Sequence, residues 1–142
     1  MKKLLVAFDG SESAMRALRH AIEQVRETDR SIHLLITHTG PIYYPEIGVS
    51  LPYYEELMAA ADRESAKLLL PAQKELEKAG VGYSKEVMCG PAASLIAERA
   101  KPTEFAGIVM GTRGMGALKG LVLGSVANQV VHLAEVPVTL VK

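Results

Sequence analysis

The sequence has one cysteine, no net charge and no long apolar run, and each absence excludes a class of protein. A single cysteine, Cys89, cannot form an internal disulfide framework, which favours a reducing compartment. Sixteen basic and sixteen acidic residues cancel, which argues against binding nucleic acid through a broad basic surface. The apolar run at 4–8 is too short for a signal-peptide core, and no stretch approaches the roughly 18 apolar residues that span a membrane. We therefore expect a cytoplasmic protein that binds neither nucleic acid nor membrane.

Several familiar motifs are also missing. The dinucleotide pattern GxGxxG does not follow the first apolar run, and the P-loop pattern GxxxxGK[ST] occurs nowhere. The SGGxDS loop of ATP-consuming ligases and pyrophosphatases is absent too, which argues against a rapid ATP-consuming enzyme of that kind. The four histidines lack the spacing of metal ligands, so we expect no metal held by the protein alone.

What the sequence does contain is an alternation of apolar runs and amphipathic segments. The run at 4–8 is typical of a strand buried on both faces, and the apolar positions between 14 and 25 predict a helix capped by Ser11 or Ser13. Further strands are predicted at 32–38, 83–88, 108–110 and 138–141, and further helices at 53–79, 92–101 and 126–134. This order predicts one α/β domain over residues 1–142, with a parallel sheet covered by helices on both faces.

Local breaks in this pattern give finer expectations. The long helix should kink or break at Pro71 and end at Gly80. Cys89 is expected to be buried near a strand end. The segment 40–52 is long for a compact domain, and four of the five tyrosines lie within it or directly after it, at 43, 44, 53 and 54. Three roles stay open for this segment: covering a ligand, facing a partner, or packing its rings onto the domain.

A glycine-rich segment from Gly111 to Ser125 follows the fourth predicted strand. Its first fourteen residues hold five glycines, which is costly in chain entropy for a loop without a task. Backbone N–H groups freed of side chains can form a concave anion site, and the last helix opens at Gly124 and Ser125 with unpaired N–H groups of its own. The pattern predicts a polyphosphate site. The alternative is a glycine-rich turn in which Ser125 only caps the helix.

A few charged or titratable side chains near the predicted strand ends are candidates for the same site. Asp9 follows the first strand, where a carboxylate can accept hydrogen bonds from a ribose diol or can cap the first helix. Arg113 and Lys119 are the cations nearest the expected phosphates, unless they are simply solvated. His38 ends the second strand and is expected to be a hydrogen-bonded structural residue rather than a catalytic one. No general base is evident, so we expect at most slow ATP hydrolysis or autophosphorylation.

The spacing G-2x-G-9x-G-S from Gly111 to Ser125 resembles the ATP-binding motif of the universal stress protein family. The resemblance covers nearly the whole chain and includes the opening 6–11, the 109–111 entry to the motif and the closing 136–138. It implies a flavodoxin-like fold with five parallel strands in the order 3-2-1-4-5. It also implies a stress-response protein that binds ATP, with any Mg²⁺ held mainly by phosphates and water.

The resemblance also implies a set of site residues. Adenine would lie near Ala7 and Thr39, and Asp9 would hold the ribose. The remaining nucleotide-binding residues, mostly at the phosphates, would be Met110, Gly111, Arg113, Gly114, Gly124, Ser125 and Val126. Two positions depart from the family pattern: Gly107 stands where an acidic residue is common, and Thr39 where an aliphatic residue is usual. These departures bear on adenine preference and local packing rather than on phosphate binding.

The final predicted strand, Val138–Val141, suggests how the chain assembles. In the implied order it lies at the sheet edge, and only Pro137 and Lys142 stand near it to block pairing. A two-fold symmetric partner would satisfy this edge, and the resemblance implies a homodimer through it. Two other functions remain open: an adaptor for an unidentified protein that does not depend on nucleotide, and a sensor of AMP or cyclic AMP.

Overall fold

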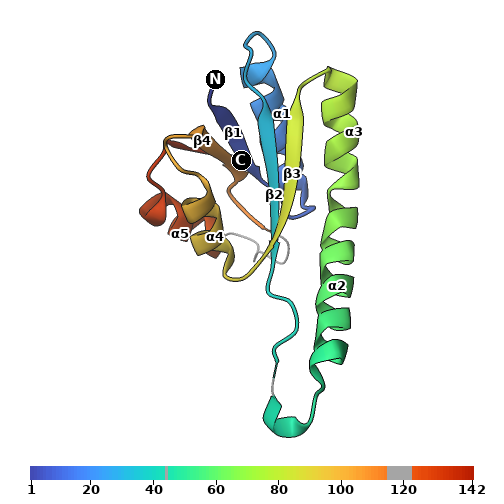
Figure 1. Ribbon diagram of the computed structural model, residues 1–142. Helices are drawn as coiled ribbons and strands as arrows, with labels where there is room; N and C mark the ends of the chain where they lie inside the picture. Colours follow the sequence, from blue (N-terminus) through green and yellow to red (C-terminus); the bar gives the residue numbers. More distant parts are fainter. Residues whose placement is uncertain (44, 115–122) are drawn as a thin grey trace.

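A parallel sheet forms the centre of the protein (Figure 1). The computed structural model describes residues 1–43, 45–114 and 123–142. The strands are β1 (Lys3–Ala7), β2 (Ile32–His38), β3 (Tyr83–Cys89), β4 (Phe105–Gly111) and β5 (Val138–Val141). They lie in the order β3-β2-β1-β4-β5, and every neighbouring pair is parallel. The expected fold class and strand order are therefore confirmed.

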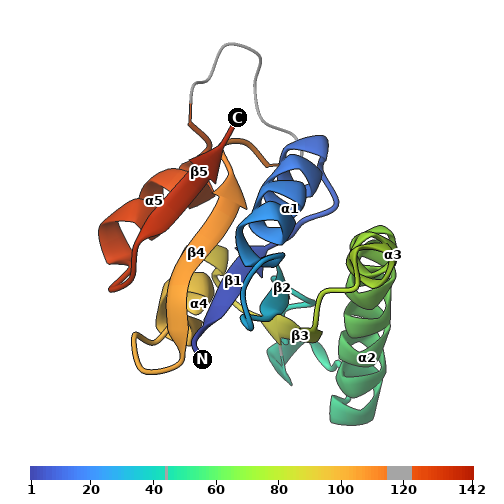
Figure 2. The same ribbon diagram turned by 90° about the horizontal axis from the view of Figure 1, so that it is seen from above.

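Helices cover both faces of this sheet, as Figure 2 shows from above. They are α1 (Glu12–Val25), α2 (Leu51–Leu68), α3 (Leu70–Ala79), α4 (Ala92–Arg99) and α5 (Ser125–Leu133), with a short 3-10 turn, η1 (Pro45–Ile47). The buried residues of α1 and α3 pack with alternate strand residues such as Val6, and those of α4 and α5 pack with the intervening ones such as Leu5. Because the central strands are buried on both sides, they read as continuous apolar runs. Among the described residues, no helix is long and apolar enough to cross a membrane.

The first helix begins as its sequence predicts. The Ser11 side chain accepts a hydrogen bond from the Ala14 N–H at 3.1 Å, and the buried positions of α1 recur every three or four residues. The long helix predicted at 53–79 breaks near Pro71, as expected, into α2 and α3, which begin at Leu51 and Leu70. The break comes two residues before Pro71, which occupies the first turn of α3, where its missing N–H costs no helical bond.

Two sequence-based expectations are wrong in detail. The fourth strand is longer than 108–110, because Phe105 is buried and Gly107 lets β5 approach: a Cβ there would lie 3.0 Å from the Pro137 carbonyl oxygen. Cys89 is exposed rather than buried, because it ends β3 at the edge of the sheet, where its thiol donates to the Thr39 carbonyl at 3.3 Å.

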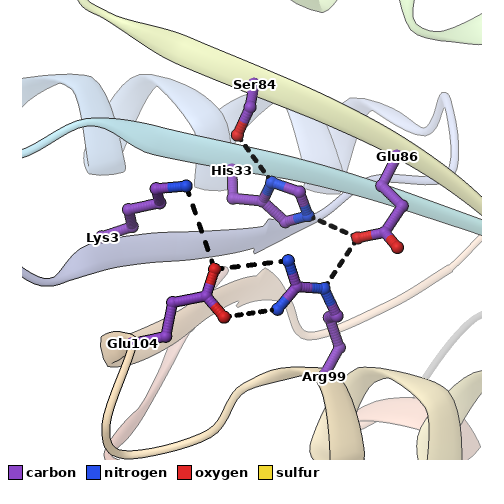
Figure 3. Close-up of polar contacts among 6 residues, drawn as sticks. All are labelled: Lys3, His33, Ser84, Glu86, Arg99 and Glu104. Atoms are coloured by element: carbon purple, nitrogen blue, oxygen red, sulfur yellow. Dashed lines mark hydrogen bonds and ion pairs between the residues drawn. The ribbon is translucent and has the colours of Figure 1, made fainter.

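At the amino-terminal ends of the strands, a chain of polar contacts joins β2, β3, α4 and the turn before β4 (Figure 3). His33, whose side chain is 6% exposed, contacts the Glu86 carboxylate at 2.8 Å through Nε2 and the Ser84 hydroxyl at 2.7 Å through Nδ1. Arg99 donates to Glu86 at 2.7 Å and to Glu104 at 2.8 Å. These contacts fix the amino end of the sheet, opposite to the end that carries the cavity described below.

The protonation of this cluster follows from its burial and charges. Burial acts to raise the pKa of Glu86, but hydrogen bonds from Arg99 and His33 outweigh it and hold that pKa below its usual value. An ionised Glu86 can only accept, so Nε2 of His33 carries the hydrogen and Nδ1 accepts from Ser84. Burial is the main cause that lowers the pKa of His33. The Glu86 hydrogen bond opposes this shift, and the Arg99 charge adds to it. His33 is therefore neutral near pH 7.

We expect the free energy of unfolding to fall as the pH decreases from about 7 to about 5. The pKa of His33 in the folded protein lies below its unfolded value of 6.5, so the unfolded chain binds more protons in this range. Denaturant titrations at several pH values measure the effect. His33→Gln should show a smaller fall than the parent protein, whereas His20→Gln, which removes an exposed histidine of α1, should follow the parent. Equal pH slopes in the parent and in His33→Gln would contradict this account.

Candidate functional site

A cavity of about 340 Å³ lies at the carboxyl-terminal ends of β1 and β4. Its volume falls within the range of roughly 300–1,000 Å³ that is usual for small-molecule sites. From β1 the chain passes to α1 on one face of the sheet, and from β4 it passes to α5 on the other. Ligands of open α/β sheets bind at such a reversal, because the two connections diverge there and leave a crevice.

Nine of the ten nucleotide-binding residues expected from the sequence line this cavity. They are Ala7, Asp9, Met110, Gly111, Arg113, Gly114, Gly124, Ser125 and Val126. Thr39 is not among the lining residues: it follows the end of β2 and is exposed. Thr37, two residues earlier on the same strand, lines the cavity instead. The hydroxyl available at the β2 wall therefore belongs to Thr37.

One end of the cavity is apolar, and most of its residues were not identified from the sequence. Leu35 and Thr37 come from β2, Ala92 and Ile96 from α4, and Ala7 from β1. The small side chain of Ala7 leaves room above β1, between β2 and α4. Periodicity alone could not have found these residues, because their role depends on which helix covers which face of the sheet.

The other end is formed by the amino terminus of α5. Gly124 occupies the cap position, no described side chain caps the helix, and the first helical bond runs from the Asn128 N–H to the Gly124 carbonyl at 3.0 Å. Ser125 is therefore the first helical residue and not the cap, which corrects the alternative considered for it. The N–H groups of Ser125 and Val126 have no helical partner, and both residues line the cavity beside Arg113. This end carries partial positive charge and suits an anion.

Asp9 lies on the cavity wall, close to Gly114. Its Oδ1 accepts a hydrogen bond from the Ser11 N–H at 2.9 Å, which fixes the carboxylate at the start of α1. Its Oδ2 lies so close to Gly114 that a Cβ on that glycine would stand 3.0 Å away. Since Ser11 already caps α1, the structure separates the two roles expected of Asp9: it orients the turn before the helix, and it presents a carboxylate at the cavity.

The motif glycines have packing reasons that the sequence did not reveal. A Cβ on Gly111 would stand 2.8 Å from the carbonyl carbon of Ser13, so its absence lets α1 lie directly on β4. A Cβ on Gly124 would stand 3.3 Å from the Thr112 carbonyl oxygen, and the Gly124 N–H donates to that same oxygen at 2.5 Å. None of the motif glycines that the structure describes has positive φ, so close approach and not backbone conformation requires them.

Some predicted features lie elsewhere or outside the described residues. His38 contacts Asp62 at 2.6 Å, in keeping with a structural histidine. The rings of Tyr43 and Tyr54 lie 5.0 Å apart, so the segment before α2 packs on α2 itself, and no described residue of 40–54 lines the cavity. Lys119 and the glycines at 116 and 120 lie outside the described residues, as does Tyr44. Within the described part of the chain, no cluster of three or more histidine, cysteine or acidic residues could hold a metal ion.

Sequence comparison finds the same family across the whole chain. The model of the universal stress protein family matches residues 1–142. Universal stress protein MJ0531 of Methanocaldococcus jannaschii is 32% identical, over 99% of this chain and 82% of that protein. Universal stress protein YxiE of Bacillus subtilis is 30% identical, over 99% of this chain and 98% of that protein.

Solved structures share the fold. The hypothetical protein MJ0577 superposes with a TM-score of 0.83 and is 29% identical, over 99% of this chain and 95% of that chain. More distant neighbours include an Archaeoglobus fulgidus universal stress protein in complex with dAMP, with a TM-score of 0.69, 22% identity and coverage of 100% and 98%. A family member from Arabidopsis thaliana with AMP bound has a TM-score of 0.68, 21% identity and coverage of 100% and 92%. A third neighbour, 20% identical over 99% of this chain and 95% of that chain, is in complex with cAMP and has a TM-score of 0.68.

We expect Gly111→Ala to destabilise the protein by about 1–3 kcal/mol, because the new methyl group meets the Ser13 backbone, which cannot move without shifting α1. Gly82→Ala is the matched control: its Cβ would make only an ordinary 3.7 Å contact with the Ser31 side chain. Chemical denaturation measures both variants. A Gly111→Ala protein as stable as the Gly82→Ala protein would show that α1 does not depend on this close approach.

Proposed function

The chain belongs to the universal stress protein family, and we propose that it is a cytoplasmic, ATP-binding member that acts in stress response as a dimeric, nucleotide-dependent regulator. The observation that carries the proposal is that one cavity is lined by an apolar slot, by the Asp9 carboxylate and by the amino terminus of α5, which no described side chain caps. These three parts match the base, the ribose and the phosphates of a nucleotide. Adenine nucleotides bound to relatives of the same fold support the class of ligand.

Each part of the nucleotide has a chemically suited surface. The apolar slot between Leu35 and Ile96 would accept the adenine ring, and the Asp9 carboxylate would accept hydrogen bonds from the ribose hydroxyls. The N–H groups at the start of α5 and the Arg113 guanidinium would face the negatively charged phosphates of ATP. Gly114 would let the backbone approach them. Mg²⁺ would be held mainly by phosphate and water, because Asp9 is the one carboxylate among the described lining residues.

The same lining predicts little catalysis. Neither histidine nor cysteine is among the described lining residues, and Asp9 is already engaged with the Ser11 N–H. We therefore propose that ATP acts chiefly as a bound regulator, with slow hydrolysis or autophosphorylation at most.

Gly114→Val should weaken ATP binding at least about tenfold, equivalent to about 1.4 kcal/mol. The branched side chain would occupy the space in front of Asp9 Oδ2, where the nucleotide is expected to lie. Isothermal titration calorimetry with ATP measures the affinity, and denaturation confirms that the variant is folded. Gly82→Ala, far from the cavity lining, should bind ATP as the parent does. Unchanged affinity in a folded Gly114→Val protein would contradict the proposal that the phosphates lie beside Gly114.

Asp9→Asn tests the ribose contact without deleting the local turn. The amide oxygen can still accept from the Ser11 N–H, but it binds hydroxyl donors more weakly than a carboxylate does. The parent should prefer ATP over 2′-deoxy-ATP, and the variant should bind the two ligands nearly equally. If the variant keeps the parent's preference while its affinity for both ligands changes, then Asp9 does not hold the ribose.

A sensor of AMP or cyclic AMP is the second candidate, because relatives of this fold bind AMP and cAMP. The helix terminus and Arg113 favour the ligand with more phosphate charge, so we expect ATP to bind more tightly than AMP. Mass spectrometry of ligand released from freshly purified, denatured protein separates the candidates. The absence of ATP, AMP and cyclic AMP from the released material would favour the adaptor that works without nucleotide.

The dimer proposal rests on the outer side of β5. The Ile108 N–H donates to the Pro137 carbonyl at 2.9 Å, and the Thr112 N–H donates to the Val141 carbonyl at 3.1 Å. Backbone groups of alternate strand residues point to the same side, so Thr139 also faces β4, while Val138 and Leu140 face away from it. An antiparallel copy of β5 would pair with those outward groups.

Leu140→Pro should therefore weaken the dimer and leave the fold intact, because proline removes an outward N–H and is tolerated on edge strands. Thr139→Pro should instead destabilise the domain, because it removes a donor to β4. Light scattering measures assembly, and thermal denaturation measures stability. A parent protein that is monomeric at micromolar concentration would refute the dimer.

A further inference from the structure

The segment from β2 into α2 projects beyond the carboxyl end of the sheet (Figure 1). We call residues 40–57, apart from 44, the acidic arm. It contains η1 and the first turns of α2, which Ser50 caps by accepting from the Tyr53 N–H at 3.3 Å. The contact between the Tyr43 and Tyr54 rings joins its two sides. The arm is therefore an ordered extension, and no described residue of it lines the nucleotide cavity.

The acidic arm exposes an unusual amount of apolar surface. The described residues include twelve exposed large hydrophobic side chains, and six of them lie in this short segment. The six are Ile42, Tyr43, Ile47, Leu51, Tyr53 and Leu57. Ile42 and Ile47 are 71% and 73% exposed. Single exposed apolar residues need no explanation, but such a concentration marks an interaction surface.

The helix α2, whose first turns belong to the arm, is also largely exposed. Of the eighteen residues of α2, only Ser65 is fully buried. Tyr53 and Leu57 are four residues apart and so lie on one face of the helix, with Glu56 beside them. The described residues of the domain thus leave Tyr53 and Leu57 exposed on this face of the helix.

The charge of the arm is one-sided although the whole chain is neutral. From Thr39 to Asp62 the sequence contains four acidic residues and no lysine, arginine or histidine. Asp62 pairs with His38, but Glu46, Glu55 and Glu56 are exposed and make no ion pair with any described residue. The apolar side chains therefore lie within a negative field.

We propose that the acidic arm is a docking surface for an amphipathic helix of another protein, in which apolar residues are flanked by lysine or arginine. Apolar contacts would supply the affinity, and the three glutamates would select a cationic partner and speed its association. A second copy of this chain fits poorly, because a two-fold contact would bring like charges together. An anionic lipid surface would be repelled by the same glutamates. The proposal does not depend on nucleotide binding.

Fluorescence anisotropy with a labelled amphipathic helical peptide of leucine and lysine tests the proposal on the intact protein. A peptide of the same pattern with glutamate in place of lysine is the control ligand. The lysine peptide should bind at micromolar concentration and lose affinity as salt is added, and the glutamate peptide should not bind. Failure of the lysine peptide to bind, or equal binding of both peptides, would overturn the proposal.

Paired variants locate the site. Ile47→Ser combined with Leu57→Ser should weaken binding at least about tenfold, a loss of about 1.4 kcal/mol. The matched control, Leu68→Ser combined with Leu70→Ser, removes two leucines that are also exposed, near the junction of α2 and α3, and should bind as the parent does. Charge neutralisation by Glu46→Gln, Glu55→Gln and Glu56→Gln should remove the salt dependence. Equal losses in both serine pairs, or a change of oligomeric state confined to the Ile47 and Leu57 pair, would refute a heterologous helix as the occupant.

Discussion

Gly111 of β4 lies so close to Ser13 of α1 that no side chain fits between them, and the geometry of the candidate site follows from this contact. It seats α1 on one face of the sheet at the end of β4, and α5 packs on the opposite face. The Gly124 N–H then bonds to the Thr112 carbonyl, which brings the start of α5 back to the strand it has just left. A helix amino terminus therefore faces the crevice above Ala7, and the glycines contribute by permitting contact between backbones.

The fold was predictable because the central strands are buried on both faces. Leu4, Leu5 and Val6 are all at most 6% exposed, and such a strand needs an apolar residue at every position. The order of the strands came from the family resemblance, since periodicity does not say which strands are neighbours. One strand boundary failed because packing overrode the local pattern: Phe105 extends β4 past the apparent break at Gly107. The helix break expected at Pro71 is present, two residues earlier at Leu69.

The site residues that contribute backbone groups could be predicted from the sequence. The residues whose role depends on the direction of the side chain could not. Glycine spacing placed Gly114 and Gly124 at the cavity, but their neighbours Asp9 and Thr112 are visible only in three dimensions. Thr39 was expected at the adenine from the family resemblance, although the strand predicted at 32–38 ends one residue before it. β2 ends at His38, and strand alternation then places Leu35 and Thr37 on the cavity side.

The two ends of the sheet differ in whether their polar groups have partners within the domain. At the amino end, neutral His33 and the charged Glu86 and Arg99 satisfy one another within the domain, so these groups stabilise the fold and leave little to bind. At the carboxyl end, the first N–H groups of α5 have no helical partner and line a cavity. The acidic arm extends from the same end with glutamates that no described cation neutralises. Polar groups left without an internal partner must be satisfied by water or by a ligand. The physical case for function therefore lies at this end of the molecule.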